Sequence, residues 1–196
     1  MTVWISAVEL TAENVVLAPL SKDHAADLRE AVDDGAMYDI WYTSVPTADG
    51  VEGEIDRRLA LQNAGSMVPF AILDRATGEA VGMTTYLNID AANRRLEIGS
   101  TWMRRSHQRG PWNTQCKFLL LCHAFEDLDC IAVEIRTHFM NHQSRRAIER
   151  LGAKLDGVLR SHMLMPNGTV RDTAAYSIIA SEWPAVKAGL EFRMQA

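Results

Sequence analysis

The sequence lacks the features that mark several large classes of protein. Its three cysteines, Cys116, Cys122 and Cys130, are an odd number and include no C-x-x-C pair, which argues against a disulfide framework and against a cysteine-rich zinc site. There is no excess of positive charge, because 20 lysines and arginines stand against 25 aspartates and glutamates, for a net charge of −5. A protein that binds nucleic acid through bulk charge is basic, so nucleic acid is not expected as the main ligand.

Long apolar runs and nucleotide-binding loops are also missing. No segment approaches the ~18 apolar residues that span a bilayer, and the first ten residues have no basic start and contain Glu9, unlike a signal peptide. The G-x-x-x-x-G-K-[ST] motif of P-loop enzymes is absent. His138, His142 and His162 do not have the spacing of metal ligands. These absences predict a soluble, reduced, cytoplasmic protein with no metal and no membrane partner.

What remains is an ordinary globular composition. Hydrophobic residues make up 47% and charged residues 23% of the 196-residue chain. A chain of this length and composition can bury a hydrophobic core without disulfides or a structural metal ion. No repeat or low-complexity linker interrupts the chain. We therefore expect a single domain over residues 1–196.

The hydrophobic pattern predicts an α/β (α+β) fold. Alternating or continuous apolar runs predict strands over residues 15–20, 68–73, 80–87, 94–103, 131–135, 155–164 and 170–179. Helical periodicity predicts helices over residues 22–32, 50–63, 114–128 and 142–151, and a short last helix capped by Ser181. This order of elements gives a mixed sheet with helices on both faces, in which the strands on either side of helix 114–128 run parallel.

The strand over 94–103 has an unusual composition. Leu96, Ile98, Ser100 and Trp102 alternate with Glu97, Gly99 and Thr101, so one face is apolar and the other carries a lone carboxylate beside a glycine. A glycine inside a strand predicts a bulge or a close approach of another group to the backbone.

The segment over 106–117 predicts a turn from a strand end into a helix. Arg109, Gly110 and Asn113 lie at its mouth. The first N–H groups of a helix are unpaired and carry partial positive charge, so such a turn can bind phosphate oxygens. An ordinary capped loop is an equal alternative for this segment taken alone.

Several separated motifs together are more specific. They are N-T-Q-C-K at 113–117 followed by H-A-F-E at 123–126, V-E-I-R-T at 133–137, the segment from Asn141 to Gly152 with A-I-E-R-L-G at 147–152, R-D-T at 171–173 and E-W-P at 182–184. In this order they resemble the N-acetyltransferases of the GNAT superfamily, in the ribosomal-protein-alanine (RimJ/RimL-like) branch. The resemblance covers essentially the whole chain and is densest over 94–186.

The resemblance implies a mostly antiparallel sheet of about seven strands with a splayed strand pair that holds acetyl-coenzyme A as cosubstrate. The residues that it places around this molecule are Ile98, Ser100, Gln108, Arg109, Gly110, Trp112, Asn113, Thr114, Asn141 and Ser144. The family's pyrophosphate loop has a glycine where this sequence has Pro111, which lacks an N–H donor. For Asn141 a helix cap, and for Ser144 a small core residue, are the structural alternatives.

The resemblance also implies direct transfer of an acetyl group to a primary amine. Glu97 is the expected base, with a solvent-facing residue paired to Arg95 or Lys117 as the alternative. Ser144 and Tyr176 are expected to assist the leaving thiolate, although a tyrosine in a central strand also suits the core. Trp41 and Tyr42 are expected to line the acceptor pocket.

The expected partners follow from this chemistry. The acceptor is a small-molecule amine or a protein N-terminus, and a second copy of the chain is a further candidate, through exposed Met163 and Met165. Because Pro111 departs from the family loop, the alternative function is a coenzyme A-binding regulatory module with weak or no catalysis.

Overall fold

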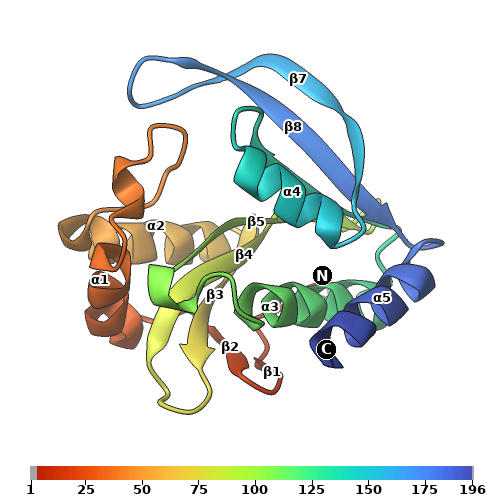
Figure 1. Cartoon of the computed structure of the whole chain (residues 1–196), viewed down its shortest axis with the longest axis horizontal. Coiled ribbons are helices and arrows are strands. Elements are labelled where there is room, and N and C mark those ends of the chain that lie inside the picture. The colour runs from red at the N-terminus through yellow and green to blue at the C-terminus, as the bar shows by residue number, and fades with distance from the viewer. Residues whose placement is uncertain (1–3, 196) are drawn as a thin grey trace.

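The computed structural model describes residues 4–195, so residues 1–3 and 196, the ends of the expected domain, lie outside it. Its centre is a sheet in the order β1-β2-β3-β4-β5-β6-β8-β7 (Figure 1). The strands are β1 (Leu10–Thr11), β2 (Val15–Pro19), β3 (Met67–Asp74), β4 (Ala80–Asp90), β5 (Arg95–Met103), β6 (Ala132–His138), β7 (Lys154–Leu164) and β8 (Val170–Ile179). All neighbouring pairs are antiparallel except β5–β6, which is parallel.

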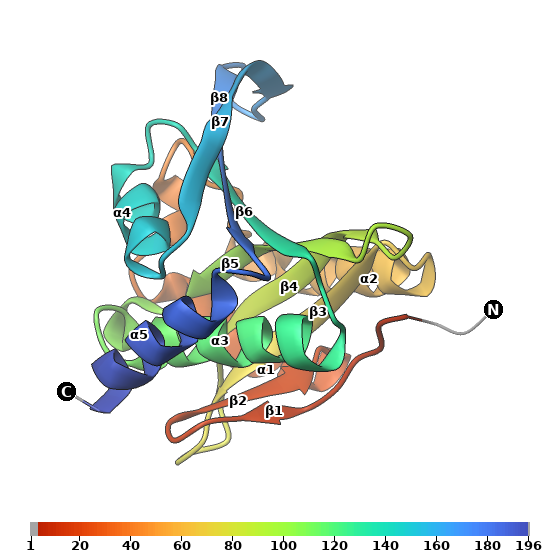
Figure 2. The same ribbon diagram turned by 90° about the vertical axis from the view of Figure 1, so that its right-hand side faces the viewer.

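Helices cover both faces of this sheet (Figure 2). They are α1 (Ala25–Asp33), α2 (Val51–Asn63), α3 (Trp112–Cys122), α4 (His142–Arg150) and α5 (Trp183–Gln195). One core cluster joins α3, α4 and α5 to one face of the sheet, with Tyr86 and Tyr176 fully buried in it. A second cluster joins α1 and α2 to the other face, around Leu28 and Ile55. The predicted α/β fold class is therefore confirmed, including the parallel pair flanking α3.

The seven predicted strands are all present, and a short eighth, β1, is added at the edge. Several helix boundaries differ from the prediction: α1 begins at Ala25, after a 3-10 turn over Lys22–His24. Helix α3 starts at Trp112, two residues early, and gives way at His123 to a π-helical turn that ends at Asp127. The last helix starts at Trp183 and extends for 13 residues, so Ser181 is not its cap and the helix is not short.

A bulge in β5 overturns the predicted alternation of that strand. Gly99 pairs with Thr85 and Trp102 with Met83, so Ser100 and Thr101 together oppose one residue of β4. Ser100 has a φ of +47°, in the left-handed region. The extra residue turns Trp102 to the opposite face from Ile98, into the α1–α2 cluster.

The parallel pair β5–β6 opens shortly after it begins. Its last paired residues are Glu97 and Glu134, although β5 continues to Met103 and β6 to His138. Beyond Glu134, β6 stays paired with β8 only, and the β7–β8 hairpin turns away from the part of the sheet formed by β2–β5 (Figures 1 and 2). The expected splayed pair is therefore β5 and β6.

The β7–β8 hairpin forms the other end of the sheet. Met163 on β7 is 47% exposed, but Met165 beyond it is buried at 6%, so the expectation that both methionines are exposed is wrong for Met165. The turn after them is tight, with Gly168 at a φ of +82°. Within residues 4–195, no helix is both long enough and apolar enough to cross a membrane.

Candidate active site

The start of α3 supplies unpaired backbone donors beside the open end of β5. Pro111 precedes the helix with a φ of −68°, a value natural to proline. The first three helical N–H groups, of Trp112, Asn113 and Thr114, have no partner within the helix. Gln115 differs, because its N–H already donates to the carbonyl oxygen of Pro111 at 2.9 Å. Three N–H groups therefore point out of the helix end, where an anion is favoured.

The loop before α3 is attached to the end of β5 by one side-chain hydrogen bond. Arg109, rather than Gly110, adopts the left-handed conformation, with a φ of +64°, and both residues are exposed. The side-chain amide of Gln108 donates to the carbonyl oxygen of Met103 at 2.8 Å, so it fastens the loop to the end of β5. Of the residues predicted to contact a pyrophosphate, Arg109 presents a charged side chain to solvent, whereas the Gln108 amide is engaged within the protein.

Glu97 is a buried carboxylate at the point where the strands separate. It is 5% exposed, accepts a hydrogen bond from the side-chain amide of Asn88 at 2.7 Å, and lies 3.6 Å from Nε of Arg136. A solvent-facing Glu97 paired with Arg95 or Lys117 is therefore wrong. Burial raises the pKa of the Glu97 carboxyl above its ordinary value, although Asn88 and Arg136 act in the opposite direction. A raised pKa suits a group that takes up a proton near neutral pH.

Asn141 and Ser144 meet at the start of α4. The side-chain oxygen of Asn141 accepts the backbone N–H of Ser144 at 3.0 Å, so Asn141 caps this helix as the structural alternative predicted. The cap uses only the oxygen and leaves the amide nitrogen of Asn141 to serve another group. Ser144 is half-buried.

The hydroxyl of Tyr176 is engaged by α4. It donates to Oε1 of Glu149 and accepts from Nε of Arg145, both at 2.9 Å. Burial is the largest cause that raises the pKa of this hydroxyl. The structure thus places Tyr176 against the helix that carries Ser144, with its proton committed to a carboxylate.

Trp41 and Tyr42 come together with a residue that the sequence reasoning did not select. The ring of His138, at the end of β6, lies 5.1 Å from Trp41 and 5.9 Å from Tyr42 between centroids. His138 is 4% exposed; its Nδ1 accepts the N–H of Met140, so the neutral ring carries its proton on Nε2, which has no partner within residues 4–195. The side-chain amide of Asn167, in the β7–β8 turn, donates to the carbonyl oxygen of Trp41 and so links the turn to this aromatic group. No signal in the sequence separates His138 from the other histidines.

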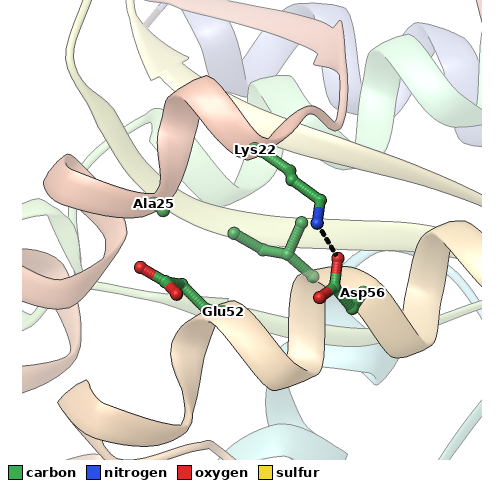
Figure 3. Close-up of a pocket in the computed structure, with 5 residues that line it drawn as sticks. Lys22, Ala25, Glu52 and Asp56 are labelled. Atoms are coloured by element: carbon green, nitrogen blue, oxygen red, sulfur yellow. Dashed lines mark ion pairs between the residues drawn. The ribbon is translucent and has the colours of Figure 1, made fainter.

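Two hollows elsewhere on the molecule lack these features. One, of about 230 Å³, lies between α1 and α2, where Lys22 and Asp56 form an ion pair at 2.7 Å (Figure 3). The other, of about 330 Å³, lies by Phe139, Val158, Arg160 and Asp172. In the described part of the chain, no three acidic, histidine or cysteine side chains are grouped to hold a metal ion.

Parallel strands that open beyond a buried carboxylate, with a helix N-terminus at their mouth, define an acetyltransferase fold of the GNAT type. The family model for the acetyltransferase (GNAT) domain matches residues 14–154. The chain belongs to this family and is an N-acetyltransferase, which confirms the resemblance found in the sequence.

Individual relatives agree with this assignment. The chain is 32% identical over 110 residues to the Bacillus subtilis protein named "Putative ribosomal N-acetyltransferase YdaF", a match that spans 56% of this chain and 59% of the relative. The crystal structure of a GCN5-related N-acetyltransferase from Brucella melitensis is 30% identical, with a TM-score of 0.86 over 97% of this chain and 86% of that one. RimL, a ribosomal L7/L12 α-N-protein acetyltransferase solved with coenzyme A, shares the fold at 18% identity, with a TM-score of 0.74 over 88% of this chain and 98% of that one.

Proposed function

We propose that the protein transfers an acetyl group from acetyl-coenzyme A to a primary amine by direct attack. The observation that carries the proposal is the opening of β5 from β6 at Glu97 and Glu134, with the free N–H groups of α3 at the same end. RimL, which has this fold, was solved with coenzyme A. In our proposal the pyrophosphate lies at the N-terminus of α3, held by Arg109 and by the N–H groups of Trp112, Asn113 and Thr114.

The proposed chemistry divides among the residues of the opening. Backbone N–H groups between Ile98 and Ser100 orient the thioester carbonyl and stabilise the negative charge that develops on its oxygen. Glu97 takes the proton of the amine, through water. On the α4 side, the hydroxyl of Ser144 assists the departing thiolate, whereas Tyr176, whose hydroxyl donates to Glu149, holds α4 in place.

The acceptor site in this proposal lies against Trp41, Tyr42 and His138. The unpartnered Nε2–H of His138 favours an acceptor that carries a carbonyl oxygen near its amine. A protein N-terminus has both groups, and the B. subtilis relative is named a ribosomal N-acetyltransferase, so this class is the first to test. Small amines without a carbonyl, such as polyamines, are the comparison class.

The test of the proposal is release of free thiol from acetyl-coenzyme A by the purified protein with peptides and small amines. Release with at least one amine supports the transferase. Binding without release by any amine favours the alternative function, a coenzyme A-binding regulatory module, which the missing donor at Pro111 keeps in consideration. A ligand-bound structure with the pyrophosphate away from α3 would contradict the proposed site.

Pro111→Gly is expected to bind coenzyme A several-fold more tightly, with little change in rate at saturation. The glycine restores an N–H donor, and a hydrogen bond to a charged group contributes about 1.5–3 kcal/mol, more than the ~0.4–1 kcal/mol lost through a looser free loop. Calorimetric titration of both proteins at one salt concentration measures the difference. Pro111→Ala is the matched variant, because alanine supplies the same donor with less added freedom. Equal or weaker binding by both variants would mean that position 111 does not face the phosphates.

Asn141→Ala is expected to weaken acetyl-coenzyme A binding or turnover about tenfold, as loss of a neutral hydrogen bond of about 0.5–1.5 kcal/mol implies. The same change removes the cap of α4, so a stability loss of about 1 kcal/mol accompanies it. Asn141→Asp separates the two effects, because the carboxylate keeps the cap and removes the amide donor. An Asp variant with wild-type affinity and rate would make Asn141 a capping residue only.

A further inference from the structure

The β5 bulge contacts two buried cations, one on each face of the sheet. Arg58 of α2 is 2% exposed and Lys117 of α3 is 6% exposed. Burial of a cation is costly unless its hydrogen bonds are satisfied, and an apolar side chain of similar size avoids the cost. Arg58 and Lys117 are therefore expected to make hydrogen bonds that an apolar side chain could not make.

Arg58 holds the bulge from the α2 side. Its Nη2 donates to the carbonyl oxygen of Ser100 at 3.1 Å, and its Nη1 donates to the hydroxyl of Thr85 at 2.5 Å. Thr85 is the β4 partner of Gly99, so one guanidinium spans the bulged residue and the strand opposite it. The third donor, Nε, is paired with Glu54 at 2.7 Å and fixes the side chain to its own helix.

Lys117 holds the bulge from the α3 side. Its ammonium donates to the hydroxyl of Thr101 at 2.6 Å, and that hydroxyl lies 2.8 Å from the hydroxyl of Thr84 on β4. No carboxylate within residues 4–195 pairs with Lys117. Burial accordingly lowers the pKa of Lys117 to about 8.

The conformation that these contacts hold is a strained one. Ser100 has a φ of +47°, which a residue with a Cβ adopts only when its surroundings enforce it. We propose that Arg58 and Lys117 are positioning residues that clamp the β5 bulge from opposite faces, and so aim the backbone N–H groups of residues 98–100 at the reacting carbonyl. This inference rests on the proposed function for its catalytic consequence, but its structural part does not.

The kinetic test compares two neighbouring arginines that share one partner. Arg58→Met is expected to lower kcat about 100-fold, because small misplacements of catalytic groups have effects of this order, while the Kd for coenzyme A changes less than about threefold. Arg57 also pairs with Glu54, at 2.7 Å, but is exposed and does not touch the bulge, so Arg57→Met is the control and is expected to keep wild-type kinetics. Equal losses in the two variants, or a coenzyme A affinity that falls as far as kcat, would overturn the clamp.

Lys117 is tested through the hydroxyl on which it acts. Lys117→Met and Thr101→Val are each expected to lower kcat about tenfold, and the double variant is expected to lose no more than the larger single effect, because both changes break one contact. Fully additive losses would overturn the role assigned to Lys117.

Amide hydrogen exchange tests the clamp without any activity. Arg58→Met is expected to speed exchange in residues 96–103, and Arg57→Met to leave it unchanged. If Arg58→Met does not fold, Arg58→Lys, which keeps the charge but not the fork of donors, is expected to show the same change more weakly. Unchanged exchange in the folded variant would overturn the clamp. If the wild-type protein acetylates no amine while exchange responds as expected, the proposed function fails and the clamp stands.

Discussion

Glu97→Gln is expected to lower kcat about 10²–10⁴-fold, the range that a general base contributes. The amide fills the same space and can still contact Asn88, but it cannot accept the proton of the amine. Thiol release with the best amine acceptor measures the effect. Glu134→Gln is the matched control, because Glu134 pairs with Glu97 across β5 and β6 and binds Arg136, yet is not assigned a proton-transfer role.

The pH dependence gives the same assignment a second test. The pKa of Glu97 is raised by burial, so this carboxylate takes up a proton at a higher pH than an exposed glutamate. The base must be ionised to act, so kcat/KM is expected to fall as the pH falls through this raised pKa. Glu97→Gln is expected to lose that acid limb. A variant with near wild-type rates and the same limb would show that another group takes the proton.

Gly82→Ala is expected to destabilise the protein by about 3 kcal/mol or more. A Cβ at this position would lie 2.2 Å from the carbonyl oxygen of Trp102 and 2.8 Å from the Cα of Met103. Both are backbone atoms of β5, so the strand itself would have to move. Denaturant unfolding measures the loss.

Gly53→Ala is the control for that substitution. Nothing lies within 4 Å of a Cβ added at Gly53, which is exposed on α2, so alanine there is expected to stabilise the helix by about 0.5–1 kcal/mol. If Gly82→Ala unfolds at the wild-type denaturant concentration, β4 and β5 are not as closely packed at this point as the structure shows.

Local patterns were sufficient for most of the fold. The alternation of Ile131, Val133 and Ile135 predicted the centre of β6, and the glycine at 152 correctly marked the end of α4, where it adopts a φ of +99°. The strand β1 was missed because two residues carry no periodic signal. The π-helical turn after Cys122 was missed because its side chains continue the apolar pattern of a helix.

The β5 bulge is a feature that local sequence patterns did not predict in detail. Gly99 predicted an irregularity, but the strained residue is Ser100, and the change of face at Trp102 depends on which residues of β4 pair with β5. Pairing between strands is not encoded in one strand's sequence.

The candidate site residues also divide into those that local sequence patterns indicated and those that depend on contacts distant in the sequence. Glu97, Asn141 and the start of α3 were selected as candidates because they lie in short segments with a recognisable order. His138 and Arg58 were missed because their significance comes from contacts with residues far along the chain: Trp41 lies 97 positions from His138, and Ser100 lies 42 positions from Arg58. Contacts over such distances form only when the chain has folded.

Two segments that lie outside the body of the sheet contribute to one side of the proposed acceptor site. Trp41 belongs to the connection between α1 and α2, Asn167 belongs to the β7–β8 turn, and one side-chain hydrogen bond of 3.0 Å joins them. Both segments are largely exposed, whereas Glu97 and the bulge are built into the core. Under the proposed function, substitutions in these two segments are therefore expected to change the accepted amine at little cost to folding, so that new acceptor preferences evolve while the residues proposed for acetyl transfer stay the same.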